Sequence, residues 1–208
     1  MRRASDENGY TMLEAIMYIS IMIVLSGVLA KYVGTVFTRY KTGRVSQQVV
    51  DLKKIIVFFT AADEDYSKLT LEELTEKKAL PFDMANQHNA LGGKIEISSV
   101  QAMRKEAGLS TTSDDNYMFH ISFDGLPRES CIELLTQGQF YGGGTDIDTI
   151  IVNNSYAWQY QYSLYDTVGL SHVQPKISLP ESSIKINITK ALEACTEEEN
   201  NKISWIFS

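Results

Sequence analysis

Residues 10–30 of the chain read YTMLEAIMYISIMIVLSGVLA, and Glu14 is the only charged side chain between Gly9 and Lys31. A run of about 20 apolar residues is long enough to cross the hydrocarbon core of a bilayer as a helix. A carboxylate at the centre of such a helix costs roughly 2.5–3.5 kcal/mol on insertion, and less near the interface. Glu14 therefore predicts a partner of opposite charge. Cleavage of the Gly9–Tyr10 bond would create one, the free amine of Tyr10.

This N-terminal segment has three possible interpretations. It could be a plain membrane anchor, a secretory signal cleaved after the small-residue sequence Val28-Leu29-Ala30, or a leader that is cut before the apolar stretch. A secretory signal does not have a carboxylate in its apolar region, and residues 1–9 (MRRASDENG) are nearly neutral rather than basic. A plain anchor gives no reason for Glu14. Only cleavage before the apolar stretch explains both features.

The sequence from Gly9 to Glu14, GYTMLE, resembles the processing motif of type IV prepilins, which is a Gly followed by a mature segment with Glu at its fifth residue. The resemblance implies that a prepilin peptidase cuts between Gly9 and Tyr10 and that the new amine of Tyr10 is methylated. It also implies that Glu14 pairs with the amine of a neighbouring subunit and so sets the register of a filament.

The helical pattern continues beyond the apolar stretch. Val45, Val49, Leu52, Ile56 and Phe59 recur at helical spacing, and the polar face carries Arg44, Gln47, Gln48, Asp51 and Lys54. We expect one helix over residues 10–62, roughly 80 Å long at 1.5 Å per residue. Its amphipathic second half should pack on a sheet. The loose basic cluster Lys31, Arg39, Lys41 and Arg44 fits either a membrane surface or an ordinary solvated helix face.

Glycines at positions 27, 34 and 43 interrupt this helix, and each weakens it by about 1 kcal/mol relative to Ala. Small residues of this kind allow close contacts between helices. By analogy with related filaments, Gly27 and Gly34 are also candidate positions for local unwinding of the helix when subunits pack.

After an acidic turn, Thr70 and Glu73 form a capping box that opens a short helix, which should end by Pro81. Pro127 should open a helix that carries Cys131 and ends at Gly138. A last short helix should carry Cys195. Strands are predicted at 94–98, 117–123, 147–153, 156–164, 183–188 and 202–207, and apolar or aromatic residues alternate along 117–123, 156–164 and 183–188. The chain is thus expected to be α+β, with a long helix and a mostly antiparallel sheet.

The sequence FHISFDGL at 119–126, followed by Cys131 on a helix, resembles the first-cysteine region of type IVb pilins. The resemblance implies a ladle-shaped pilin fold whose C-terminal region is pinned by a Cys131–Cys195 disulfide. The N-terminal apolar segment also indicates export to an oxidising compartment, where such bonds form. We expect a leader at residues 1–9, a spine helix at 10–62 with 10–30 as the membrane and filament-core part, and a globular head at 63–208.

The composition and the remaining motifs give no sign of catalysis. A net charge of -7 argues against a nucleic-acid partner. His88, His120 and His172 show no metal-binding spacing, and His120 is expected at the surface or boundary of its strand. The sequence GGGTDID at 142–148 lacks the P-loop lysine and the full set of calcium ligands, so it predicts a loop. The aromatic stripe that begins at Tyr156 more often fills a sheet core than binds a ligand. No enzyme activity, cofactor or metal is expected.

The leading hypothesis is therefore a structural subunit of a type IV, type IVb-like pilus. Such a precursor would sit in the inner membrane and later form a homo-oligomeric helical filament at the cell surface. The resemblance implies three partners: the prepilin peptidase, an inner-membrane platform protein and an assembly ATPase. The alternatives within this class are a minor or tip pilin and a type II secretion pseudopilin. From another class, the alternative is a secreted binding domain released after Ala30.

Overall fold

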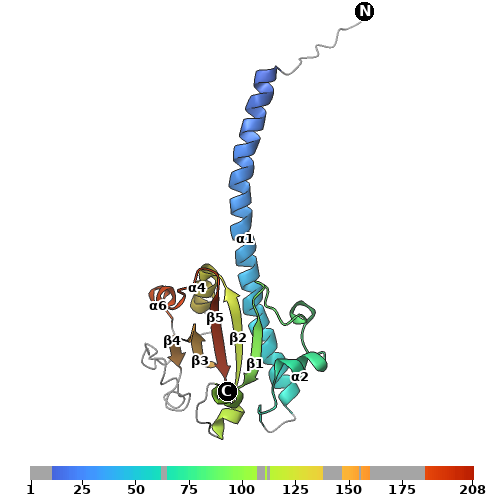
Figure 1. Cartoon of the computed structure of the whole chain (residues 1–208), viewed down its shortest axis with the longest axis vertical. Coiled ribbons are helices and arrows are strands. Elements are labelled where there is room, and N and C mark those ends of the chain that lie inside the picture. Colours follow the sequence, from blue (N-terminus) through green and yellow to red (C-terminus); the bar gives the residue numbers. More distant parts are fainter. Residues whose placement is uncertain are drawn as a thin grey trace, which may run out of the picture. The chain divides into compact units, whose positions relative to one another are not determined.

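The computed structural model describes residues 11–61, 65–106, 111, 113–137, 147–154, 156–159 and 186–208. The chain divides into two compact units, residues 1–40 and residues 41–208. We call them the N-terminal unit and the head. Helix α1 (Met12–Thr60) begins in the N-terminal unit and ends in the head, as the helical pattern predicts (Figure 1).

The head adds a sheet and several short helices to the second half of α1. In chain order these elements are α2 (Leu71–Glu76), η1 (Phe82–Met84), β1 (Ile95–Ser99), α3 (Val100–Glu106), η2 (Asp114–Tyr117), β2 (Phe119–Leu126), α4 (Arg128–Thr136), β3 (Ile147–Val152), β4 (Tyr156–Gln159), α6 (Ile188–Ala194) and β5 (Asn201–Phe207). The predicted cap of α2 is present, since Thr70 Oγ1 accepts a hydrogen bond from the Glu73 amide at 3.1 Å. Pro127 immediately precedes α4, as expected.

The described strands form one five-stranded sheet in the order β1-β2-β5-β3-β4, and every pairing in it is antiparallel. The C-terminal strand β5 lies at the centre, between β2 and β3 (Figure 1). On the outer side of β1, Thr70 forms a bridge with Ser98, and His88 forms one with Lys94, the residue just before the strand. These bridges occupy backbone groups at the edge that would otherwise be open to pairing with another chain.

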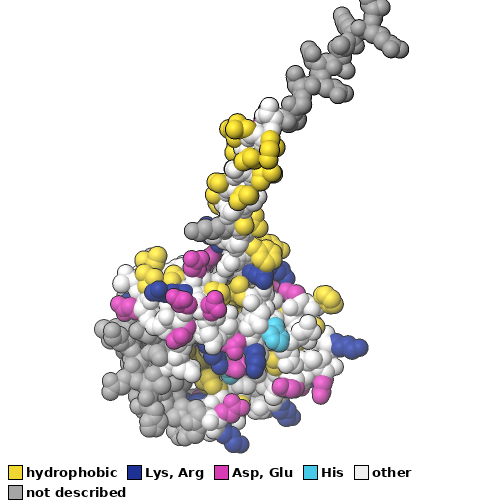
Figure 2. Space-filling model, turned by 45° about the horizontal axis from the view of Figure 1, so that its top comes forward, with side chains coloured by type: hydrophobic (Ala, Val, Ile, Leu, Met, Phe, Trp, Pro, Cys, Tyr) yellow, Lys and Arg dark blue, Asp and Glu magenta, His cyan; other side chains and the backbone are white. Residues whose placement is uncertain are grey.

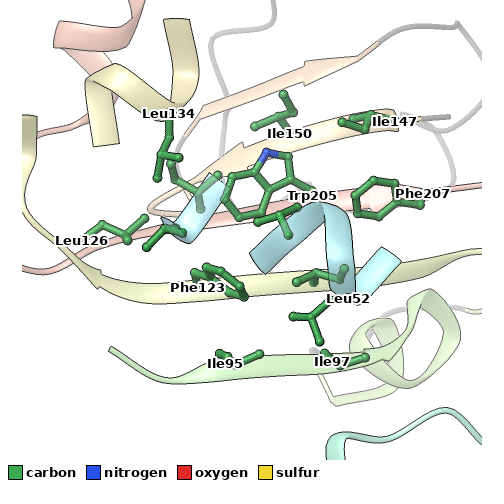
Figure 3. Packing of buried hydrophobic residues seen from close by; sticks show 14 of the residues in the cluster. Leu52, Ile95, Ile97, Phe123, Leu126, Leu134, Ile147, Ile150, Trp205 and Phe207 are labelled. Atoms are coloured by element: carbon green, nitrogen blue, oxygen red, sulfur yellow. The ribbon is translucent and has the colours of Figure 1, made fainter. Parts of the chain in front are cut away.

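The main core lies between one face of the sheet and the second half of α1. Val45, Val49, Leu52 and Ile56 of the predicted stripe are buried, whereas Phe59 is 36% exposed, so its predicted burial is wrong. The stripe meets side chains of β1, β2, β3 and β5, and Figure 3 shows Leu52 among Ile95, Ile97, Phe123, Trp205 and other residues of this core. The ring of Trp205 packs edge-on against Phe123, with 5.9 Å between the centroids.

Polar side chains beside the apolar stripe tie α1 to the segments on its two sides. Toward α4, Thr42 Oγ1 donates to Ser130 Oγ at 2.8 Å, and Ser46 Oγ donates to Gln137 Oε1 at 2.9 Å. On the other side, Gln48 Oε1 accepts from the Ala90 amide at 2.9 Å. Gln48 is 1% exposed, although the sequence places it on the polar face of the helix. The solvent-exposed face of α1 is therefore narrower than predicted, because some of its polar side chains form hydrogen bonds with buried groups of the head.

The opposite face of the sheet has a second, smaller core. Val100 of α3 packs there with Met118, Ile151 and Ile206, and partly buried Met103 borders the cluster. Beside this cluster, Arg104 of α3 and Asp115 of η2 form a buried ion pair, with 3.3 Å between Nη1 and Oδ1. Because α3 and η2 are not apparent in the hydrophobic pattern, the sequence did not predict that this face is covered.

The covered second face corrects the prediction for His120. This side chain is 7% exposed rather than at the surface or boundary, and its Nδ1 lies 3.2 Å from Ser98 Oγ. Burial lowers the pKa of His120 from 6.5 to about 4, with a smaller contribution in the same direction from the charge of Lys202. Glu96, which pairs with Lys202, acts in the opposite direction. His120 is therefore neutral inside the folded head at neutral pH.

The C-terminal elements agree with the sequence in part. Strand β5 matches the predicted strand at 202–207. The predicted strand that ends at Ile188 is wrong at that end, since Ile188 is the first residue of α6. Asn187 caps this helix, because its Oδ1 accepts from the Lys190 amide at 2.9 Å. The described part of the chain does not include residues 138–146 and 160–185. Most of the predicted glycine-rich loop, most of the aromatic stripe and His172 fall in these two ranges.

Gly93 lies in the turn that leads into β1, where another part of the backbone comes very close. A Cβ at this position would lie 1.8 Å from the carbonyl oxygen of Asp124, and one at Gly125 would lie 2.7 Å from Gly93 Cα. Gly125 also has a φ of +65°, which side-chain-bearing residues rarely adopt. The loop before β1 and the turn at the end of β2 thus fit together only without these side chains.

Substituting Gly93 therefore should destabilise the head. Gly93→Ala should lower the free energy of unfolding by roughly 2–4 kcal/mol, because one of the two backbone segments must shift. Gly43→Ala is the matched control, because a Cβ at Gly43 meets nothing within 4 Å. It should raise stability by up to about 1 kcal/mol. Urea denaturation of both variants in detergent measures the difference, and equal stabilities would contradict the close approach.

The buried His120 should make the stability of the head depend on pH. Between about pH 6.5 and about pH 4 the unfolded chain binds a proton at this residue and the folded chain does not. Stability should thus be complete above about pH 6.5 and fall by about 3 kcal/mol as the pH drops toward 4. Urea denaturation at pH 7 and pH 5 tests this loss of stability.

His120→Gln should flatten the dependence of stability on pH in this window, and His88→Gln, at an exposed position, should not. A His120→Gln profile as steep as that of the parent would refute the assignment.

Candidate functional site

The N-terminal unit is a helix with apolar side chains on all of its sides. From Met12 to Tyr40 its large apolar side chains are between about half and four-fifths exposed within the chain. This segment contains the part of α1 that is long and apolar enough to cross a membrane by length and composition. An apolar surface of this size on a helix needs a cover, which a bilayer or other helices can provide.

Hydroxyl groups within this apolar segment bond to the helix itself. Ser20 Oγ donates to the Ile16 carbonyl at 2.8 Å, Ser26 Oγ to Met22 at 2.6 Å and Thr38 Oγ1 to Gly34 at 3.1 Å. Each hydroxyl thus reaches the carbonyl four residues earlier and donates its hydrogen inside the helix. Such back-bonding makes these polar residues compatible with hydrocarbon surroundings.

Glu14 lies in the first turn of α1. The preceding loop residue Thr11 caps the helix, since its Oγ1 accepts from the Glu14 amide at 3.4 Å and its carbonyl accepts from the same amide at 3.0 Å. Glu14 is exposed, and a carboxylate in the first turn is favoured by the positive end of the helix dipole. The sequence motif therefore also serves as a helix start, which sequence reasoning had not assigned to it. Gly9 and Tyr10 lie outside the described residues.

Gly27 and Gly34 lie inside regular helix, where a Cβ at either position would meet nothing within 4 Å. Neither glycine is thus required by packing within the described part of one chain. Local unwinding at these positions stays a prediction for the assembled state.

The predicted disulfide is present and joins two helices of the head. Cys131 lies in α4 and Cys195 at the C-terminal end of α6, with 6.0 Å between their Cα atoms, and both residues are fully buried. The bond closes a loop with a sequence separation of 64 residues. On the chain-entropy model a loop of this length stabilises the fold by about 4 kcal/mol. The disulfide therefore fixes α6 against α4.

Two asparagines form a second fastening of the same region, which the sequence did not reveal. Asn201 is fully buried, and its Nδ2 donates to the carbonyls of Leu126 and Glu197 at 3.0 and 2.6 Å. Its Oδ1 accepts from Asn153 Nδ2 at 2.9 Å. Asn153 Nδ2 also donates to the Ala194 carbonyl at 3.0 Å. We call this pair the asparagine clasp, and it holds the segment between α6 and β5 to the end of the sheet.

Histidines and carboxylates do not combine into a metal site in the described part of the chain. No group of three or more His, Cys, Asp or Glu side chains lies close enough to hold an ion there. His120 contacts Ser98, and His88 Nδ1 lies 2.6 Å from the Asn86 carbonyl. The groups with a recognisable role are therefore the apolar helix with Glu14 and the fastened C-terminal region.

The fold and these two features define a type IV pilin: a long N-terminal helix with an uncovered apolar half, an antiparallel sheet on its other half, and a disulfide-closed C-terminal region. The family model described as PilS N terminal matches residues 39–208, so the chain belongs to the PilS family. The crystal structure of TcpA, a type IV pilin from Vibrio cholerae El Tor biotype, is similar with a TM-score of 0.49 and 14% sequence identity. That similarity covers 81% of this chain and 99% of the other. No curated protein sequence matches the chain.

The asparagine clasp can be tested by a one-atom change. Asn201→Asp removes the Nδ2 donor to the Leu126 and Glu197 carbonyls and places a carboxylate at a fully buried position. It should lower the free energy of unfolding by about 2–4 kcal/mol. Asn200→Asp is the matched control at the neighbouring exposed position, and it should change stability by less than about 0.5 kcal/mol. Urea denaturation of both variants with the disulfide intact gives the comparison. Equal effects would show that the clasp contributes nothing specific.

Proposed function

We propose that this chain is a structural subunit of a type IV, type IVb-like pilus. A prepilin peptidase cuts the precursor between Gly9 and Tyr10, and the new amine of Tyr10 is methylated. The precursor waits in the inner membrane with the apolar first part of α1 in the bilayer and the head outside. A platform protein and an assembly ATPase then move it into a homo-oligomeric helical filament at the cell surface. The carrying observation is the apolar surface of residues 12–40, which the described part of the chain leaves exposed.

Assembly transfers this surface from lipid to the helices of neighbouring subunits. Each fully buried Leu, Ile, Val or Met side chain contributes roughly 1.5–3 kcal/mol relative to exposure in water. Both environments supply this apolar cover, so the transfer leaves most of the hydrophobic free energy unchanged. A filament of identical subunits also needs a contact between two different surfaces of the subunit, because only such a contact repeats without closing. The register of that contact then has to come from a specific interaction.

Glu14 provides that register in the proposed filament. Its carboxylate pairs with the Tyr10 amine of a neighbouring subunit, and the ammonium offsets the cost of burying the carboxylate among apolar side chains. A subunit displaced along its neighbour would leave both charges buried and unpaired. Since breaking a buried pair by removing one partner costs roughly 3–5 kcal/mol, displaced arrangements are strongly disfavoured.

The exposed side chains after Ala30 argue against a secreted domain released at that residue. Such a protein would keep Tyr32, Val33, Val36, Phe37 and Tyr40, all more than half exposed, on an N-terminal helix in water. Soluble proteins rarely leave an apolar surface of this extent uncovered. The pilus interpretation gives these residues the same cover as the rest of the N-terminal unit.

Substitutions at Glu14 and Thr11 separate the intermolecular charge pair from the helix cap. Glu14→Gln keeps a side chain that suits the first turn but removes the charge. We expect leader cleavage and membrane insertion to persist, and filament yield to fall about 100-fold or more because the amine is left unpaired. Immunoblots of cells and electron microscopy of sheared filaments measure these outcomes.

Thr11→Ala is the matched control, because it removes the cap hydroxyl and keeps the charge. It should destabilise the helix start by about 1 kcal/mol and reduce the filament yield only slightly. If Glu14→Gln cells assemble normal numbers of filaments, the register proposal fails. If Thr11→Ala abolishes filaments as completely as Glu14→Gln does, the cap and not the charge pair is the essential function of the motif.

A further inference from the structure

The last turns of α1 expose apolar side chains on the face of the helix that points away from the sheet. Val57 is 44% exposed and Phe58 is 77% exposed. They follow Lys54, which is also exposed, by three and four residues, so the three side chains lie on one face, opposite to the buried stripe. The ring of Phe58 packs edge-on against Phe59, with 5.7 Å between the centroids. We call Lys54, Val57 and Phe58 the α1 end face.

The short helix α6 exposes a second apolar pair. Ile188 is 63% exposed and Leu192 is 43% exposed, and as neighbours one turn apart they lie on one face of the helix. Glu193, the next residue, is exposed beside them. Figure 2 shows hydrophobic side chains at the surface beside acidic ones at the upper left of the head, where Figure 1 draws α6. We call Ile188, Leu192 and Glu193 the α6 face.

The two faces lie at opposite ends of the head. Cys195 at the end of α6 is bonded to Cys131 of α4, and the preceding residue, Ser130, accepts a hydrogen bond from Thr42. Because the head begins at Lys41, the α6 face is held close to the point where α1 enters this unit. Phe58 lies about 24 Å further along the helix than Thr42, at 1.5 Å per residue. One head therefore cannot bring its own two faces together.

The α1 end face and the α6 face are complementary in charge and similar in size. Each has two large apolar side chains with one charged side chain beside them, which is Lys54 on the first face and Glu193 on the second. A contact between three side chains and three others buries less than the roughly 1,000 Å² that a stable interface needs, so free heads would associate weakly. Such a contact becomes effective where the copies are already held side by side, because their effective concentration is then high. A second copy of this chain in the proposed filament meets both conditions.

We propose that, in the filament, the α1 end face of one head packs on the α6 face of the next. Phe58 lies against Ile188 and Leu192, and Lys54 pairs with Glu193 at the edge of the contact. Since the two faces differ and lie at opposite ends of the head, the contact repeats from subunit to subunit without closing. This inference rests on the proposed filament and adds a contact between heads to the contacts of the N-terminal helices. It also gives the disulfide a function in assembly, because that bond holds α6 in position.

Paired cysteines in the full-length chain test the contact directly. Phe58→Cys/Leu192→Cys should give a ladder of linked dimers, trimers and longer species when sheared filaments are oxidised and separated without reductant. The two introduced cysteines are too far apart to bond within one head, and the native pair Cys131 and Cys195 is already joined and fully buried. Phe58→Cys/Lys105→Cys is the matched control, with its second cysteine at an exposed position of α3, and it should stay monomeric, as should each single variant.

Charge reversal gives a second readout that needs no introduced cysteine. Lys54→Glu and Glu193→Lys should each lower the yield of filaments about threefold to tenfold, because an exposed pair of opposite charges becomes a pair of like charges. The combined variant should recover most of the parent yield. Lys105→Glu makes the same change in net charge at an exposed position outside both faces, and it should leave the yield unchanged.

Several results would overturn the contact between heads. Filaments that assemble from the Phe58→Cys/Leu192→Cys chain without forming a ladder remove the contact and leave the filament itself intact. A dimer formed by the Phe58→Cys chain alone assigns the α1 end face to a symmetric contact instead. If the paired-cysteine chain makes no filaments, the charge reversals decide, and a combined variant no better than Lys54→Glu alone rejects the contact. Absence of filaments from the parent chain refutes the proposed function, and this inference with it.

Discussion

The rest of this structure depends on the need to cover the apolar surface between Met12 and Tyr40. Apolar side chains project from every side of this helix, and the described part of the chain leaves them exposed. Water is an unfavourable surrounding for such a surface, so the segment has to lie in lipid or among other helices. The proposed order of events meets this need, because a membrane covers the apolar surface in the precursor and neighbouring subunits cover it in the filament. Glu14 matters because it is the one charged side chain in the first part of that surface.

The same helix changes character where it enters the head. Beyond Lys41 it has a buried apolar stripe, with Val49 and Leu52 packed on the sheet, although Val57 and Phe58 near its end are exposed. Polar residues on both sides of the stripe, such as Thr42 and Gln48, bond to the flanking segments. Both apolar packing and hydrogen bonds therefore hold this part of the helix in the head. The disulfide and the asparagine clasp then fix the C-terminal region, so two unlike fastenings act on one part of the fold.

Local patterns made most of the architecture predictable. The apolar run, the helical stripe at Val45 and Val49 and the alternation along β2 all led to the observed elements, because each pattern reflects the burial of apolar side chains. The capping residues Thr70 and Pro127 marked helix starts through short-range hydrogen bonding and fixed backbone geometry. The disulfide was predictable because the chain has only two cysteines and an N-terminal segment that indicates export to an oxidising compartment, and the family resemblance agreed with it. The features that sequence reasoning missed depend instead on contacts between distant segments. His120 alternates with apolar neighbours and was therefore assigned to an open face, but α3 and η2 cover that face. The clasp joins Asn153 to Asn201, which lie 48 residues apart in the sequence, and no local pattern around either residue predicts the contact.

The N-terminal residue of the mature protein tests the central claim most directly. Sequencing and mass measurement of the chain recovered from sheared surface filaments should give Tyr10 as the first residue, with one added methyl group on its amine. A mature chain that begins at Lys31 would lack both Glu14 and most of the apolar surface on which the account depends. That result would contradict the filament assignment outright.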